Sequence, residues 1–286
     1  MSRNALVTGG TGFVGQWLAR ELLKDGWNVL ALGLHAPSTG VLSAAEHSAV
    51  QWLHGDIRDS DAVFRAVEKG APDAIFHLAG VSFIPDAGGM PAATYDVNVL
   101  GAVRLLSELG RRRAAGVLDP VILVIGSATQ YGRHPAEDMP LAESSEQRPA
   151  DVYAASKAAQ EIAALQIHRA EGVRVVCTRS FNHSGPGHPD HFLLPALVRR
   201  ALALRSSDNR ELRLGNQDSI RDYLHVADVV QAYLLLVRHG EPGQVYNVCS
   251  GTGISVRQLA EEVLLQVGVE AEITTDPSLV RGVDIP

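Results

Sequence analysis

The sequence predicts an α/β fold built on a doubly wound parallel sheet. Short apolar stretches alternate with stretches of helical length along most of the 286 residues. The apolar stretches are continuous rather than alternating, as expected for parallel strands that are buried on both faces. A glycine-rich turn joins the first strand to the first helix. These features predict successive strand–helix–strand units in one sheet.

Composition is that of an ordinary globular protein, with 46% hydrophobic and 20% charged residues. The length suits one large domain, or a large domain with a smaller attachment. A net charge of −7 argues against a nucleic-acid-binding surface. We interpret the Arg111–Arg113 run as cations at the end of a helix rather than as a partner patch. Cys177 and Cys249 lie in apolar contexts, which fits a reduced protein better than a disulfide framework.

The chain shows no sign of a membrane or export segment. The N-terminus runs directly into a strand without a charged leader, and no apolar run is long enough to span a bilayer. We therefore expect a cytoplasmic protein without membrane contact.

The first strand is expected at residues 4–8, and a helix is expected to end at about Lys24. Between them lies a Gly-x-x-Gly-x-x-Gly turn. Such a turn brings the backbone close to a pyrophosphate, and the helix N-terminus offers N–H groups and a partial positive charge. A plain glycine-rich turn is the alternative. The cofactor contacts expected from this turn are Gly9, Gly12, Phe13, Val14 and Gly15.

A second strand is expected at residues 28–32. In NAD-binding proteins an acid at the end of this strand holds the adenosine ribose. Here Gly33 takes that place and is followed by Leu34 and His35. No carboxylate is present to repel a 2′-phosphate and no arginine to bind one, so NADP is permitted but not established. His35 is a candidate phosphate contact, with an exposed loop histidine as the alternative.

The third and fourth strands, expected at residues 51–57 and 74–80, carry further cofactor candidates. Asp56 can accept a hydrogen bond from the adenine amino group. The small residues at the end of the fourth strand would let the cofactor lie close. The candidates on these strands are Asp56, Ile57, Leu78, Ala79 and Gly80. Helices are expected at residues 60–69 and 100–112.

The fifth strand, residues 120–125, leads into Ser127. Ligands of such sheets lie beyond the carboxyl ends of the strands, so Ser127 is placed to hydrogen-bond a substrate oxygen. A serine that only caps a loop turn is the alternative. Further helices are expected at residues 153–171, 195–204, about 228–239 and 255–267, with strands at 173–178, 244–248 and 271–274.

Tyr153 and Lys157 lie four residues apart and therefore share one face of the expected helix. A phenol has an ordinary pKa of about 10, and both a nearby ammonium and an oxidised nicotinamide ring favour its phenolate. The pair can then donate and accept a proton near neutral pH. An accidental pair on an exposed helix is the alternative.

These motifs, in this order, resemble the extended short-chain dehydrogenases/reductases of the nucleotide-sugar epimerase, dehydratase and reductase group. Within this group the chain is most similar to GDP-4-keto-6-deoxy-D-mannose reductases, with GDP-mannose 4,6-dehydratases as close relatives. The motifs that carry the resemblance are Thr8-Gly-Gly-Thr-Gly-Phe-Val-Gly15, His77-Leu-Ala-Gly80, Ser127-Ala-Thr-Gln-Tyr-Gly132, Tyr153-x-x-x-Lys157, Phe181-Asn-His-Ser-Gly-Pro-Gly187 and Arg221-Asp-Tyr-Leu-His-Val-Ala-Asp228.

The resemblance implies roles for single residues. Tyr153 would be the acid and base, Lys157 would lower its pKa and hold the nicotinamide ribose, and Ser127 would orient the sugar oxygen. The substrate contacts that it implies are Ser82, Thr129, Asn182, Arg221 and Arg281. For Arg221 a guanidinium suits phosphate oxygens, with a structural salt bridge to Asp222 or Asp228 as the alternative.

The resemblance also implies a division of the chain and a partner. A Rossmann-type NAD(P)-binding domain would comprise residues 1–178 with 222–249. An interleaved nucleotide-sugar lobe would comprise residues 179–221 with 250–286. Relatives pair the helices at about 98–113 and 153–171 in a dimer, so a homodimer is expected. They also continue beyond the position of Pro286, so we expect either that part of the sugar-site wall is absent from this chain or that the sequence is a shortened piece of a longer one.

One departure from the family pattern bears on the reaction. Dehydratases of the group carry a glutamate two residues after the serine or threonine, where this chain has Thr129. A dehydratase is therefore disfavoured. The reading that remains is reduction of a 4-keto-6-deoxyhexose linked to a nucleotide diphosphate, preferably GDP, with NAD(P)H. A 4-epimerase with retained NAD and a non-catalytic dinucleotide sensor are the alternatives. The eleven histidines form no metal-binding motif, so no metal is expected.

Overall fold

The computed structural model describes residues 3–37, 40–207 and 210–280. The chain forms two compact units. The first contains the residues up to Phe181 together with Val226–Val248, and the second contains Asn182–His225 together with the residues from Cys249 on. These boundaries lie within four residues of those expected from the sequence. The assignment of one unit to cofactor and the other to sugar stays a prediction.

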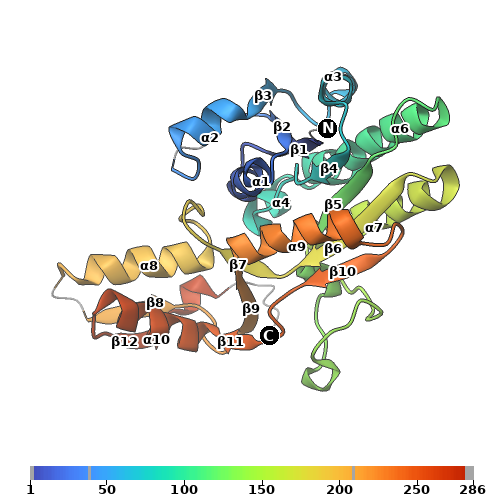
Figure 1. The fold of residues 1–286 in the computed structure, drawn as a ribbon. Coiled ribbons are helices and arrows are strands. Elements are labelled where there is room, and N and C mark those ends of the chain that lie inside the picture. The colour runs from blue at the N-terminus through green and yellow to red at the C-terminus, as the bar shows by residue number, and fades with distance from the viewer. Residues whose placement is uncertain (1–2, 38–39, 208–209, 281–286) are drawn as a thin grey trace. The chain divides into compact units, whose positions relative to one another are not determined.

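A seven-stranded parallel sheet forms the centre of the first unit (Figure 1). Its order is β10-β6-β5-β4-β1-β2-β3, so the chain winds outward in one direction from β1 and then in the other from β4. The strands are β1 Asn4–Thr8, β2 Asn28–Gly33, β3 Gln51–His54, β4 Ala74–His77, β5 Val121–Ser127, β6 Arg174–Ser180 and β10 Val245–Val248. The expected fold class is confirmed.

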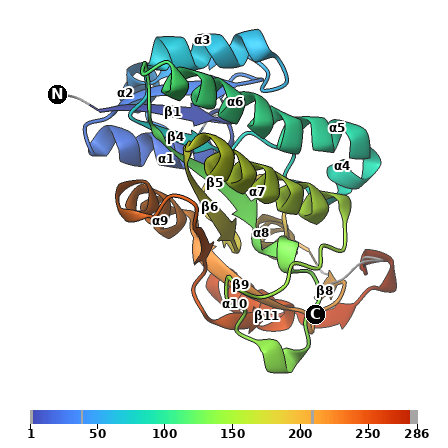
Figure 2. The ribbon, with the colours of Figure 1, turned by 90° about the vertical axis from the view of Figure 1, so that its right-hand side faces the viewer.

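Helices cover both faces of this sheet (Figure 2). The helices α3, α6 and α7 pack together over one face, and α1 and α9 pack together over the other. These helices are α1 Phe13–Lys24, α3 Ser60–Gly70, α6 Gly101–Ala114, α7 Val152–Glu171 and α9 Val226–His239. Shorter elements are α2 Ala44–Ala49, α4 Ile84–Gly89, α5 Pro91–Tyr95, the π-helical turn η1 Asp96–Leu100, and the 3₁₀ turns η2 Ala128–Tyr131 and η3 Ala136–Asp138.

Burial explains why these segments form strands. The four residues of β4 are all buried, as are the first four of β5. Leu6, Ile75 and Ile122 on three neighbouring strands are fully buried and belong to one core cluster, which also includes Leu106 of α6. Continuous apolar sequence therefore corresponds to strands covered on both faces.

Two strands end earlier than the sequence predicts. The third was expected to reach residue 57 and ends at His54, and the fourth was expected to reach residue 80 and ends at His77. Beyond these points the chain leaves the sheet, and Asp56 and Ala79 lie in the loops at its carboxyl edge. The candidate cofactor residues on these segments are therefore loop residues.

The second unit contains two small sheets. In the first, β9 lies between β11 and β7, and in the second, β8 pairs with β12. Its elements are β7 Asn182–Ser184, α8 Leu193–Leu204, β8 Glu211–Leu214, β9 Ile220–His225, β11 Gly253–Ser255, α10 Val256–Val267, β12 Glu272–Thr275 and the 3₁₀ turn η4 Pro277–Leu279. The helices α8 and α10 pack on β8 and β12 around a core of their own. Among the helices of the described residues, none is long and apolar enough to cross a membrane.

Candidate active site

The glycine turn after β1 is tightly packed against the loop after β4. Gly9 has a φ of +71°, and a Cβ atom added to it would lie 2.7 Å from the backbone nitrogen of Ala79. A Cβ atom on Gly15 would lie 2.6 Å from Cα of Gly10. Gly12 is the N-cap of α1 and caps it with no side chain. A turn without side chains beside a helix N-terminus lets a pyrophosphate come close to the backbone N–H groups.

A buried threonine–histidine pair ties β1 to β4 below this turn. Thr8 Oγ1 lies 2.8 Å from Nδ1 of His77 and accepts a hydrogen bond from the Ala79 N–H at 3.3 Å. Burial, and to a smaller extent the charge of Lys157, lowers the pKa of His77 to about 3. His77 is therefore a neutral structural residue near neutral pH. The sequence analysis did not single it out.

Gly33 closes the end of β2 against the glycine turn. A Cβ atom on Gly33 would lie 2.3 Å from Oγ1 of Thr11, so no side chain fits there unless Thr11 moves. His35 lies in the exposed loop that follows. The position that carries an acid in many NAD-binding proteins is thus occupied by the Thr11 side chain.

Asp56 is held by the residue two positions further on. Its Oδ2 accepts hydrogen bonds from Nη2 of Arg58 at 2.6 Å and from Nε at 3.0 Å, and its Oδ1 accepts from the Arg58 N–H at 2.8 Å. These hydrogen bonds lower the pKa of Asp56 against the opposing effect of burial. Ile57 is buried and packs against Gly101 of α6. Contact of Asp56 or Ile57 with an adenine stays a prediction.

Ser127 ends β5 and caps the 3₁₀ turn η2. Its Oγ accepts hydrogen bonds from the Thr129 N–H at 3.3 Å and from Thr129 Oγ1 at 2.9 Å. With two bonds accepted, the hydroxyl keeps its own proton to donate. The Ser127 hydroxyl lies near the Tyr153 phenol and acts to lower the pKa of that phenol. The structure thus brings together two of the three residues that the sequence predicted as catalytic.

Burial raises the pKa of Tyr153, and the nearby Ser127 hydroxyl acts in the opposite direction. In the protein alone burial is the larger effect. The lowered pKa that we expect from Lys157 and an oxidised nicotinamide stays a prediction for the complex.

Lys157 is 5% exposed and lies one helical turn beyond Tyr153. Its Nζ donates to the carbonyl oxygen of Ile125 at 2.8 Å and to Oε1 of Gln160 at 3.0 Å. Burial lowers its pKa to about 8. A Cβ atom on Gly80 would lie 3.5 Å from Nζ, so the bare backbone of Gly80 keeps space beside the ammonium group. An ammonium has three N–H donors, and these two acceptors leave the third for a ligand.

Asn98 joins the loop after β4 to the helix that carries Tyr153. Its Oδ1 accepts from the Val81 N–H at 2.7 Å, and its Nδ2 donates to Ser156 Oγ at 2.8 Å. Ser156 Oγ in turn donates to the carbonyl oxygen of Tyr153 at 2.7 Å. Asn98 is fully buried in the π-helical turn η1, a kind of distortion that is frequent at functional sites. The sequence analysis gave Asn98 no role.

The remaining substrate candidates lie in other segments. Ser82 is exposed in the loop before α4, and Thr129 lies beside Ser127. Asn182 and Arg221 lie on β7 and β9 of the second unit. Arg281 falls outside the described residues. Sugar-nucleotide contacts of all five stay predictions.

Arg221 and its neighbour Asp222 have separate contacts. Arg221 Nη1 donates to the carbonyl oxygen of Ile220 at 2.7 Å. The Asp222 carboxylate accepts from the N–H groups of Ser250 at 2.9 Å and Gly251 at 2.7 Å. Asp222 thus has a structural role in the turn after β10, and the phosphate contact of Arg221 stays a prediction.

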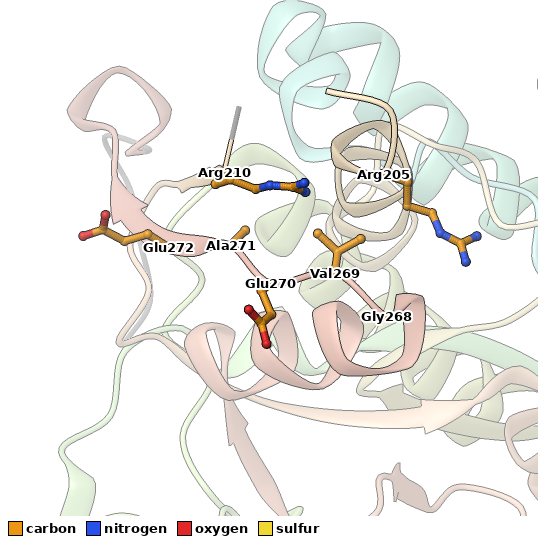
Figure 3. Close-up of a pocket in the computed structure, with 7 residues that line it drawn as sticks. All are labelled: Arg205, Arg210, Gly268, Val269, Glu270, Ala271 and Glu272. Carbon is orange, nitrogen blue, oxygen red and sulfur yellow. The ribbon is translucent and has the colours of Figure 1, made fainter. Parts of the chain in front are cut away.

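A cavity of about 820 Å³ lies in the second unit and is lined by Arg205, Arg210 and Gly268–Glu272 (Figure 3). Its charged side chains point in different directions and do not converge on one point. None of the predicted catalytic residues lines it. Among the residues that the structure describes, no group of three or more His, Cys, Asp or Glu side chains could hold a metal ion.

Comparisons with known proteins find relatives that match most of the chain. The sequence profile of the GDP-mannose 4,6 dehydratase family matches residues 6–282. A GDP-6-deoxy-D-mannose reductase from Pseudomonas aeruginosa is 36% identical over 98% of this chain and 86% of its own length. A UDP-glucose 4-epimerase from Streptomyces lividans is 33% identical over 92% of this chain and 80% of its own length.

A solved structure of RMD from Pseudomonas aeruginosa in complex with NADPH has a TM-score of 0.79 and 34% identity. The comparison covers 96% of this chain and 85% of that one. Both the sequence profile and the fold therefore extend over nearly the whole chain. The chain belongs to the GDP-mannose 4,6 dehydratase family, and it is an NAD(P)-dependent enzyme of the extended short-chain dehydrogenase/reductase type.

Proposed function

We propose that this enzyme reduces the C4 ketone of a 4-keto-6-deoxyhexose linked to a nucleotide diphosphate, with GDP as the preferred nucleotide. The observation that carries the proposal is the placement of Ser127 near Tyr153, with Lys157 one helical turn from Tyr153. The 36% identity to a GDP-6-deoxy-D-mannose reductase supports this substrate class.

Ser127, Tyr153 and Lys157 have different roles in the proposed reduction. The reduced nicotinamide, when bound, supplies the hydride to the ketone carbon. Ser127 donates a hydrogen bond to the ketone oxygen, and Tyr153 Oη–H transfers its proton to the same oxygen. The phenolate that results lies one helical turn from the Lys157 ammonium, which stabilises it. A proton from solvent restores the phenol.

Thr129 supports a reductase over a dehydratase. A dehydratase needs a carboxylate to remove the proton at C5, and this position offers a hydroxyl that already donates to Ser127. The remaining alternative is a 4-epimerase, favoured by the similarity to the Streptomyces lividans enzyme. In that reaction Tyr153 deprotonates the C4 hydroxyl, and the resulting ketone is reduced on its other face.

NADPH is the donor that we propose. Gly33 carries no acid that would repel a 2′-phosphate, and the Thr11 side chain fills the space beside it. The related enzyme from Pseudomonas aeruginosa was solved with NADPH.

The test is a mass-spectrometric assay with GDP-4-keto-6-deoxymannose and, as a control, dTDP-4-keto-6-deoxyglucose. NADPH and NADH are each supplied in excess. The proposal expects one reduced cofactor consumed per product, a product heavier by one hydride and one proton, and a preference for the GDP sugar and NADPH. Interconversion of plain nucleotide hexoses without net cofactor use would indicate the epimerase instead. Cofactor binding without turnover of any sugar would favour the non-catalytic sensor.

We further infer a homodimer through α6 and α7. Apolar residues lie exposed where the partner would pack, since Ile162 of α7 is 64% exposed and Leu100, just before α6, is 48% exposed. The substitution Ile162→Arg is expected to shift the light-scattering mass from dimer to monomer. A monomer mass for the unmodified protein at micromolar concentration would contradict the inference.

A further inference from the structure

A buried ion pair between Glu161 and Arg179 is linked to Ser127 through Gln130. Glu161 follows Tyr153 and Lys157 at the same four-residue spacing on α7. Its carboxylate accepts from Nη2 of Arg179 at 2.7 Å and from Nε at 3.0 Å, and both side chains are 5% exposed. The reaction proposed above uses neither residue.

Both glutamines that contact Glu161 donate to it. Gln130 Nε2 donates to Oε2 at 2.8 Å, and Gln147 Nε2 donates to Oε1 at 2.6 Å. The carboxylate therefore accepts four hydrogen bonds. A buried charge is otherwise costly, so its retention needs partners of this number and quality.

The fixed charge of Glu161 determines how the Gln130 amide is oriented. A carboxylate only accepts hydrogen bonds, so the NH₂ group of Gln130 must face Glu161 and its oxygen must face away. That oxygen accepts from the Ser127 backbone N–H at 2.8 Å. Gln130 is fully buried, so water cannot replace either partner. The chain of contacts ends at Ser127, whose hydroxyl lies near the Tyr153 phenol.

The hydrogen bonds to Glu161 keep the Arg179 guanidinium charged although it is buried. Burial alone would lower the pKa of Arg179, but its hydrogen bonds to Glu161 raise the pKa above its ordinary value. The guanidinium also lies over the ring of Tyr131, with Cζ 4.7 Å from the ring centroid. Tyr131 ends the turn η2 that Ser127 begins, so Arg179 holds the far end of the same turn.

We propose that Glu161 is a positioning residue, which acts through Gln130 to fix the Ser127 backbone and so aims the Ser127 hydroxyl at the reacting oxygen. This inference rests on the proposed function, in which Ser127 orients the sugar oxygen. It also makes a claim about Tyr153 that needs no sugar. A displaced Ser127 hydroxyl stabilises the Tyr153 phenolate less, and the pKa of Tyr153 then rises.

The experiment compares Gln130→Met with the matched control Gln147→Met. Each variant removes one hydrogen bond to Glu161, but of the two glutamines only Gln130 bonds the Ser127 N–H. Gln130→Met is expected to lower kcat by about 10- to 100-fold with little change in the KM for NADPH, because small misplacements of a reacting group cost rate rather than cofactor affinity. Gln147→Met is expected to change kcat by less than about 3-fold.

A double-variant cycle separates positioning from general loss of structure. If Gln130 acts through Ser127, Gln130→Met lowers kcat no further once Ser127→Ala is present. An equal fractional loss in both backgrounds, or equal losses from the two glutamine variants, would overturn the proposal. Should Gln130→Met fail to fold, Gln130→Asn keeps the amide but is one methylene short and takes its place.

A direct titration keeps the inference distinct from the sugar assignment. The phenol of Tyr153 is followed by ultraviolet difference absorbance in the NADP⁺ complex, with Tyr153→Phe as the blank. Gln130→Met should raise the Tyr153 pKa, and Gln147→Met should not. An unchanged pKa in Gln130→Met overturns the positioning role even if no sugar is turned over. Failure of the unmodified enzyme with every sugar, together with a raised pKa, rejects only the substrate.

Discussion

The two halves of the sheet's carboxyl edge use different chemistry. At β1 and β2 the loops are built from bare backbone, where Gly9 and Gly33 leave no space for a side chain. At β5 and β6 the functional groups are buried charged side chains, with Lys157, Glu161 and Arg179 each 4–5% exposed. One half is suited to a large ligand lying along the backbone. The other half holds a few reacting atoms in fixed positions.

The two halves lower the stability of the fold in different ways. Glycines at β1 and β2 cost mainly chain entropy. Gly9 is enclosed by backbone atoms, and Gly33 is enclosed by the Thr11 side chain. The charged side chains near β5 and β6 lose their solvation when they are buried. For Lys157 this burial lowers the pKa to about 8. Variants in the first half should therefore affect cofactor affinity and stability. Variants in the second half should affect turnover, and also stability where a buried charge loses its partner.

The largest expected effect is on turnover, from Tyr153→Phe. This variant removes the only proton that the mechanism delivers to the sugar oxygen. We expect kcat to fall by about a thousandfold or more, with NADPH affinity by fluorescence titration within about 3-fold of the unmodified enzyme. Near-normal turnover would show that the acid is another group and would break the comparison between the two halves.

The next effect is on stability, from Arg179→Met. It leaves the Glu161 carboxylate buried without its counter-ion, which typically costs about 3–5 kcal/mol of unfolding free energy. The control is Arg65→Met, where the pair with Asp59 is 3.9 Å apart and both side chains are more than half exposed. Exposed pairs contribute little, so this variant should unfold almost as the unmodified protein does in urea. Equal destabilisation by the two variants would mean that burial of the pair has no energetic consequence.

The same contrast explains what the sequence predicted. The glycine turn, Ser127, Tyr153 and Lys157 are each recognisable within one short segment, because a turn or one helix face is a local property. The sheet was predictable for the same reason, since each buried strand is a continuous apolar run. The elements that the sequence analysis missed, such as the three-residue strands β7 and β11, are short and polar and form only by pairing with β9.

The supporting residues of the site could not be predicted in this way. Asn98 and Glu161 lie inside helices where a polar residue usually marks the solvent face. Their partners are far away in sequence, 58 residues for Asn98 with Ser156 and 31 for Glu161 with Gln130. A buried polar network depends on which segments meet in space, and the periodicity of any one segment does not contain that information. A polar residue on the face that Tyr153 and Lys157 share was the one available signal for Glu161.

A third prediction concerns the glycine half, through Gly9→Ala and Gly26→Ala. Both glycines have a positive φ, +71° and +74°, so alanine carries a similar backbone strain of about 1 kcal/mol at each. Only at Gly9 does the new methyl group meet neighbouring backbone, at Leu78 and Ala79, while Gly26 has nothing within 4 Å.

Gly9→Ala should therefore lose roughly 1–3 kcal/mol more unfolding free energy than Gly26→Ala. It should also weaken NADPH binding, whereas Gly26→Ala should leave binding unchanged. Denaturant unfolding and fluorescence titration measure the two effects. Equal losses at both sites would show that strain, and not close approach of the two loops, is what these glycines relieve.

The smallest effect sharpens the boundary between the halves, where His77 of β4 lies. Its pKa is lowered to about 3, against about 6.5 when unfolded, so the unfolded chain binds a proton that the folded chain refuses. The stability that comes from keeping His77 neutral is complete above about pH 6.5 and is lost as the pH falls toward 3. The slope is about 1.4 kcal/mol per pH unit for one such group.

In His77→Asn the amide oxygen can still accept a hydrogen bond from Thr8. Between about pH 6 and 4 the unfolding free energy of this variant should fall with decreasing pH by about 1.4 kcal/mol per pH unit less than that of the unmodified protein. A parallel pH dependence in the two proteins would mean that His77 is protonated in the fold, and that the strands β1 and β4 are joined by a charge and not by a neutral hydrogen bond.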